Sequence, residues 1–126
     1  MRLYFMIGIF GLVGIFARYG LNLLFIKQSP PGLPISTFLI NLLGSFLIGV
    51  VYVLGVERSA ISNEIRTALM VGLLGGFTTF SSLSLEAAVL IKNSQELLAL
   101  TYVLASTVCG ILLTFGGIFL TRSISL

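Results

Sequence analysis

Near the middle of the chain the sequence reads Gly75-Gly76-Phe77-Thr78-Thr79-Phe80-Ser81-Ser82. Paired glycines loosen a helix, and the hydroxyl groups that follow offer the freed backbone other hydrogen-bond partners. Apolar sequence flanks the stretch on both sides, so we predict a helix break at membrane depth. Irregular backbone is tolerated there only where it is buried in protein or lines a wet cavity. We interpret the stretch as an ion or solute site on a discontinuous membrane helix.

The composition is that of an integral membrane protein. Of 126 residues, 57% are hydrophobic and only 9% are charged, and the mean hydropathy is +1.14. A soluble domain of this size does not need so much apolar surface. We therefore expect a single all-α domain over residues 1–126 in a lipid membrane. The net charge of +3 is too small and too scattered to favour nucleic-acid binding.

Four apolar stretches are long enough to cross a bilayer, which takes about 20 residues as a helix. We predict four transmembrane helices at residues 3–25, 34–56, 65–91 and 97–120. The polar connections between them are short, so neighbouring helices should run antiparallel. The third helix should be broken in mid-membrane within the Gly75–Ser82 stretch.

The distribution of Lys and Arg gives a weak orientation signal. In a four-span topology Arg2, Arg58, Arg66 and Arg122 lie on one side, and Lys27 and Lys92 lie on the other, joined by Arg18 if its side chain reaches that side. Orientation follows this bias, which here is only one or two charges. Either the chain inserts inefficiently in one orientation, or it inserts in both. The second option favours an antiparallel, dual-topology homodimer with a two-fold axis in the membrane plane.

Polar and small residues recur at helical spacing along the predicted spans. These residues are Thr37, Asn41 and Ser45, then Thr79, Ser82 and Glu86, then Tyr102, Ser106, Gly110 and Thr114. Such stripes either pack helices together or line a polar path. Arg18 and Glu86 either snorkel to the membrane interface or act as functional ionisable groups inside the span.

The candidate lining is rich in hydrogen-bond donors and has no ring of carboxylates. Hydroxyls, the Asn41 amide and the Arg18 guanidinium together favour an anion over a cation. The edges of the Phe77 and Phe80 rings add partial positive charge. Carbonyl oxygens freed by the helix break can also hold a small cation.

Three motifs carry a resemblance to a known family. They are Gly75-Gly76-Phe77-Thr78-Thr79-Phe80-Ser81 followed by Glu86, Asn41-Leu42-Leu43-Gly44, and Gly14-Ile15-Phe16-Ala17-Arg18-Tyr19. In these motifs, and in length and four-span layout, nearly the whole chain resembles the Fluc (CrcB) fluoride channels. The resemblance implies a dual-topology antiparallel homodimer with two pores, which exports fluoride passively through the plasma membrane of a bacterium or other microbe.

The same resemblance implies roles for individual residues. Backbone carbonyls of Gly75 and Thr78 from both subunits would hold a structural sodium ion at the dimer centre. Asn41 and Phe80 would line the fluoride pore, and Arg18 would lie at its vestibule. A track of hydroxyls would continue the pore, formed by Thr79, Ser82, Tyr102, Ser106 and Thr114. Two positions depart from the family pattern, because Leu83 replaces a second phenylalanine and Gly110 stands where a hydroxyl is often found.

Three other classes of protein compete with this interpretation. A small dual-topology multidrug or cation transporter would need a membrane-buried carboxylate, usually in the first helix, where this chain has Arg18 instead. An enzyme is not expected, because a chain without His or Asp and with one Cys offers few acids, bases or nucleophiles. A purely structural membrane protein would not need a broken polar helix.

Overall fold

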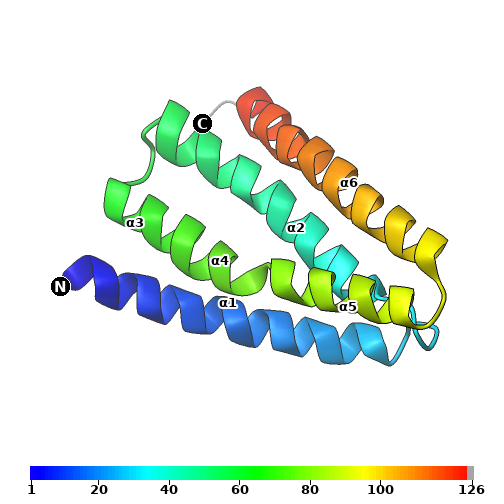
Figure 1. The fold of residues 1–126 in the computed structure, drawn as a ribbon. Coiled ribbons are helices and arrows are strands. Elements are labelled where there is room, and N and C mark those ends of the chain that lie inside the picture. The colour runs from blue at the N-terminus through cyan, green and yellow to red at the C-terminus, as the bar shows by residue number, and fades with distance from the viewer. Residues whose placement is uncertain (125–126) are drawn as a thin grey trace.

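The computed structural model describes residues 1–124 and is all-helical, with no strand in that range (Figure 1). Four helical segments are long and apolar enough to cross a membrane: Arg2–Ile26, Ile35–Glu57, Asn63–Lys92 and Glu96–Ser123. The four predicted spans are confirmed. The largest difference is at the end of the fourth, which runs to Ser123 rather than to residue 120.

Two of the four segments are composite. The first and fourth segments are the single helices α1 (Arg2–Ile26) and α6 (Glu96–Ser123), and the second joins α2 (Ile35–Tyr52) to the π-helical turn η1 (Val53–Glu57). The third consists of α3 (Asn63–Thr67), the π-helical η2 (Ala68–Leu74), α4 (Gly75–Phe77) and α5 (Phe80–Lys92). π-Helices are rare and are often found at functional sites. The position of η2 directly before α4 therefore makes this segment a candidate functional site.

The segments pack side by side with α1 and α6 on opposite sides of the bundle (Figure 1). α1 packs mainly against η2 and α4, whereas α2 packs mainly against α6. α5 also packs against α6. The half of the third segment before the break thus belongs to the α1 side of the bundle, and the half after it contacts α6.

Glycines allow α1 and the third segment to approach backbone to backbone. A Cβ atom added at Gly14 would overlap the Leu73 carbonyl oxygen, and one added at Gly76 would lie 2.6 Å from the Gly11 carbonyl oxygen. Close approach of this kind is how membrane helices associate. Gly11 and Gly14 of α1 therefore serve helix packing.

One cluster of buried side chains lies where α5 meets α6. Leu83, Leu90, Ala99 and Tyr102 form a buried cluster there. Large apolar residues such as Phe119 are exposed on the outside of the bundle, as a helix solvated by lipid tails requires.

Two arginines tie the end of α6 to η1. The Arg122 guanidinium forms an ion pair with Glu57. Arg58 Nη2 donates to the carbonyl oxygens of Arg122 at 3.1 Å and Ile124 at 2.8 Å. These carbonyls belong to the end of a helix, where intrahelical partners are missing.

Candidate functional site

The third segment is broken at two threonines. α4 ends at Phe77, Thr78 and Thr79 are extended with ψ values of 158° and 112°, and α5 begins at Phe80. The predicted break is therefore confirmed. Gly75 and Gly76, however, remain helical. Gly76 serves the close contact with α1 described above, and the adjacent hydroxyl residues form the break itself.

The two threonine hydroxyls satisfy backbone groups on either side of the break. Thr78 donates to the Leu74 carbonyl through both its N–H and its Oγ1, each at 2.9 Å. Thr79 Oγ1 accepts the N–H of Ser82 at 3.2 Å and thereby caps the first turn of α5. Helix ends leave such groups without partners, so this pair of hydroxyls makes a break at membrane depth tolerable.

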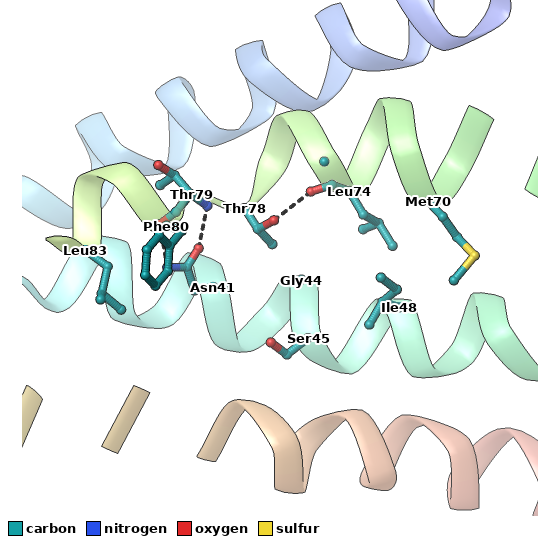
Figure 2. Close-up of a pocket in the computed structure, with 11 residues that line it drawn as sticks. Asn41, Gly44, Ser45, Ile48, Met70, Leu74, Thr78, Thr79, Phe80 and Leu83 are labelled. Atoms are coloured by element: carbon teal, nitrogen blue, oxygen red, sulfur yellow. Dashed lines mark hydrogen bonds between the residues drawn. The ribbon is translucent and has the colours of Figure 1, made fainter. Parts of the chain in front are cut away.

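Asn41 on α2 bonds to the extended backbone itself. Its Oδ1 accepts the Thr79 N–H at 2.7 Å, and its Nδ2 donates to the Thr79 carbonyl at 3.0 Å. Figure 2 shows the side chain facing Thr79 across the break. The sequence placed Asn41 at the site but gave no sign of this two-point contact.

A groove opens beside the break, and we call it the break groove. Its volume is about 320 Å³, and its lining includes Asn41, Ser45, Gly75, Thr78, Phe80 and Leu83 (Figure 2). The Phe80 side chain is 81% exposed here, whereas Leu83 is only 9% exposed because it packs into the core between α5 and α6. The break groove contains no carboxylate.

A second hollow, which we call the Arg18 cavity, lies between α1, α2 and α5. Its volume is about 400 Å³, and its lining includes Arg18, Asn22, Thr37, Thr79, Ser82 and Glu86. Thr79 lines both hollows. The break therefore stands between the break groove and the Arg18 cavity.

Glu86 is held inside the bundle. Thr37 Oγ1 donates to its Oε1 at 2.6 Å, and Tyr102 Oη donates to its Oε2 at 2.7 Å. Of the two interpretations left open by the sequence, snorkelling does not apply to Glu86, because its carboxylate faces hydroxyls on α2 and α6. Tyr102 is engaged by this contact and lines neither the break groove nor the Arg18 cavity.

The other hydroxyls of α6 lie away from the break. Thr114 Oγ1 donates to the carbonyls of Ser45 at 2.9 Å and Gly110 at 3.1 Å. Ser106 Oγ is buried and has no partner within residues 1–124. Neither side chain lines the break groove or the Arg18 cavity. Gly110 and Thr114 of the α6 stripe therefore face α2, whereas Tyr102 faces Glu86 on α5.

One polar residue of the site was missed in the sequence. Asn22 lines the Arg18 cavity, and its Oδ1 accepts a hydrogen bond of 2.5 Å from Ser36 Oγ. An asparagine near the end of an apolar span was the available signal, since a membrane-embedded amide needs partners.

The chain is similar to proteins with a stated function. A family model described as "CrcB-like protein, Camphor Resistance (CrcB)" matches residues 5–118. A protein of Chlorobium phaeobacteroides named "Fluoride-specific ion channel FluC" is 38% identical over 119 residues, which is 94% of this chain and 92% of that protein. A protein of Thermus thermophilus with the same name is 44% identical over 117 residues, 93% of each chain.

The matched range covers nearly all of the helical bundle and includes the positions of Arg18, Asn41 and the helix break. The family and the names of its relatives point to an ion channel and not to an enzyme, as the residue content led us to expect. With four membrane-length helices and these matches, the chain is a multi-pass membrane protein that belongs to the CrcB-like family.

Proposed function

We propose that this chain is a fluoride-selective channel that lets fluoride leave the cytoplasm passively. The observation that carries the proposal is the break groove, where hydrogen-bond donors and an exposed phenylalanine ring meet without any carboxylate. Relatives that match almost the full chain are named as fluoride-specific channels, which supports fluoride as the conducted ion.

The chemistry of the groove suits a small anion. Ser45 and Asn41 add a hydroxyl and an amide to the lining, and the Phe80 ring presents an edge that carries partial positive charge. On the other side of Thr79, Arg18 supplies a full positive charge to its cavity. A positive group at the mouth of a pathway raises the local concentration of anions.

The backbone at the break suits a small cation as well. In an unbroken helix the Thr79 N–H would bond to the Gly75 carbonyl and the Ser82 N–H to the Thr78 carbonyl. Here these two donors bond to Asn41 Oδ1 and to Thr79 Oγ1 instead. The carbonyl oxygens of Gly75 and Thr78 are among those that lose their helical partners, and both residues line the break groove.

We propose that these carbonyls hold one structural sodium ion. Carbonyl oxygen is a suitable donor for a small hard cation, and unwound membrane helices present it in transporters. One chain offers a pair of such oxygens, and a second copy of the chain would complete the shell. The ion would reduce the repulsion between the carbonyl oxygens and hold the broken segments of the two subunits together.

A second copy would also cover the open side of the groove. Val71 and Phe80 on the third segment are 60% and 81% exposed. We propose an antiparallel homodimer with two pores, because the weak Lys/Arg bias permits both orientations. A bacterial plasma membrane is the proposed location, since the relatives named above are bacterial.

Efflux from liposomes tests the function. Vesicles loaded with potassium fluoride and containing the purified protein should release fluoride to an electrode once valinomycin allows charge balance, and vesicles loaded with potassium chloride should not release chloride. Vesicles without protein are the control. Equal efflux of both halides would contradict the proposal, and fluoride movement only under an imposed proton gradient would indicate a coupled transporter.

A further inference from the structure

The contact between Asn41 and Thr79 carries an inference beyond the lining of a pore. We propose that Asn41 is a positioning residue that clamps the broken backbone and fixes the direction of its carbonyl groups. We call this two-point contact the Asn41 clamp. The clamp itself is independent of which ion the protein conducts, and only its effect on fluoride flux rests on the proposed function.

The geometry is that of one step of a β-ladder. Thr79 has φ −150° and ψ 112°, which are strand values. In an antiparallel sheet such a residue gives its N–H and receives at its C=O from a single opposing residue. The Asn41 side-chain amide takes the place of that residue, with 2.7 Å to the N–H and 3.0 Å to the carbonyl. Among uncharged side chains, only a carboxamide offers an acceptor and a good donor at this separation.

The backbone N–H of Thr79 needs an outside partner, because only the carbonyl of this N-cap residue is used by α5. The Thr78 hydroxyl is directed to the Leu74 carbonyl, and the Thr79 hydroxyl is next to Ser82. Neither serves the N–H and C=O of Thr79, a residue that is only 9% exposed. An N–H group left without a partner at this depth strongly disfavours a structure, so without the clamp the segment would open more often at Thr79.

The clamp also keeps one carbonyl oxygen free. By accepting the Thr79 N–H, Asn41 Oδ1 removes the donor that the Gly75 carbonyl would have in a continuous helix. Asn41 would therefore act on a cation at the break without touching it. Its oxygen is already occupied, and one N–H of its amide remains for any anion in the groove.

Amide exchange at Thr79 distinguishes a clamp from a simple pore ligand. The protein is labelled with ¹⁵N-threonine in lipid nanodiscs, and hydrogen–deuterium exchange is followed by NMR. The Thr79 amide should be protected in the wild type and should exchange at least about tenfold faster in Asn41→Ala, because exchange reports local opening. The Thr78 amide, which bonds to Leu74, is the internal control and should change little.

Asn22→Ala is the matched control variant. It removes another membrane asparagine with an interhelical hydrogen bond, but one that does not touch the break. Thr79 protection should remain in this variant. A Thr79 amide that exchanges freely in the wild type, or is equally protected in Asn41→Ala, would overturn the clamp.

Asn41→Asp provides a second readout if the alanine variant does not fold. Measured at a pH high enough to ionise the new carboxyl group, the variant keeps the acceptor for the Thr79 N–H and loses the donor to the Thr79 carbonyl. With a ¹³C=¹⁸O label at Thr79, the infrared carbonyl band should move to higher frequency, while the amide stays protected. An unmoved band would mean that Asn41 does not hold this carbonyl.

Fluoride efflux measured in the same variants separates the proposal of the clamp from the proposal of a fluoride channel. If the wild type conducts fluoride, Asn41→Ala should reduce efflux together with Thr79 protection, whereas Asn22→Ala should retain the protection. If the wild type does not conduct, the proposed function fails, and the exchange and infrared results still decide the clamp.

Discussion

The hydroxyl of Tyr102 on α6 donates a hydrogen bond of 2.7 Å to the carboxylate of Glu86 on α5. Thr37 on α2 donates to the other carboxylate oxygen, so three helices meet at a single side chain. Hydrogen bonds to charged groups stabilise more than neutral ones, although within membranes the measured values are modest. This contact is the polar complement to the apolar cluster formed by Leu83, Leu90 and Ala99.

Tyr102→Phe should therefore destabilise the protein by about 1 kcal/mol, since it removes one donor and little volume. Thermal unfolding of the detergent-solubilised protein measures the change. Tyr4→Phe is the matched control, because Tyr4 is 79% exposed on α1. An equal effect of the two substitutions would show that the Tyr102 hydroxyl contributes nothing specific.

Phe80 should matter more for fluoride conduction than Leu83. Phe80→Leu removes a ring that stands 81% exposed in the break groove, so efflux from liposomes should fall clearly. Wild type should conduct although Leu83 replaces a second ring. A silent wild type together with a conducting Leu83→Phe variant would show that the second ring is required.

Leu83→Phe should also lower stability. Leu83 packs against the core between α5 and α6 and is only 9% exposed, so a larger side chain enters a filled space. Overpacking of this kind typically costs about 1–3 kcal/mol. A melting temperature equal to that of wild type would mean that the new ring turns into the break groove, which Leu83 also lines.

Gly14→Ala should prevent normal packing of α1. The added methyl group would overlap the Leu73 carbonyl oxygen, and backbone cannot move aside as a flexible side chain can. Gly20→Ala in the same helix is the control, because a Cβ there meets nothing within 4 Å. Size-exclusion chromatography of the two variants should give an aggregated or unstable Gly14→Ala and a normal Gly20→Ala. If both elute as wild type, α1 does not approach the third segment this closely.

Sodium should stabilise the protein if the proposed ion is bound. A ligand at 100 times its Kd adds about 2.7 kcal/mol. Melting temperatures should be higher in sodium chloride than in N-methylglucamine chloride at equal ionic strength. Thr78→Ala should keep this difference, because the proposed ligand is its backbone carbonyl. Identical melting in both salts would argue against the ion.

Dual topology should be visible by chemical labelling. Lys92 is exposed in the connection between α5 and α6, so a single cysteine placed there in a Cys109→Ser background should be accessible. In whole cells, an impermeant maleimide should modify about half of the protein, and permeabilisation should expose the rest. Complete labelling, or none, before permeabilisation would indicate a single orientation.

The helices were predictable because they depend on the length and hydropathy of each stretch, and these are local properties. The existence of the break was also predictable from hydroxyls and glycines in an apolar span. Its exact position was not, because the role of Gly76 depends on how closely α1 approaches. A sequence does not give that distance.

The clamp and the Glu86 contact could not be predicted for a related reason. Asn41 and Thr79 are 38 residues apart, and Thr37 and Glu86 are 49 apart. Their pairing depends on how far α2 and α5 are shifted relative to each other along the bundle axis. Packing along the whole bundle fixes this shift. Helical spacing identified the polar faces correctly but left their partners open.

The glycine contacts between α1 and the third segment have a consequence for how the bundle responds to heat. Helices in a bilayer keep their backbone conformation when they separate, so the entropy gained there comes largely from side-chain rotamers. When a contact made by Gly14 and Gly76 against backbone separates, it releases almost no side-chain entropy. The α5–α6 contact, made by side chains such as Leu83 and Leu90, releases much more. Warming should therefore loosen the contact between α5 and α6 before the contact between α1 and the third segment.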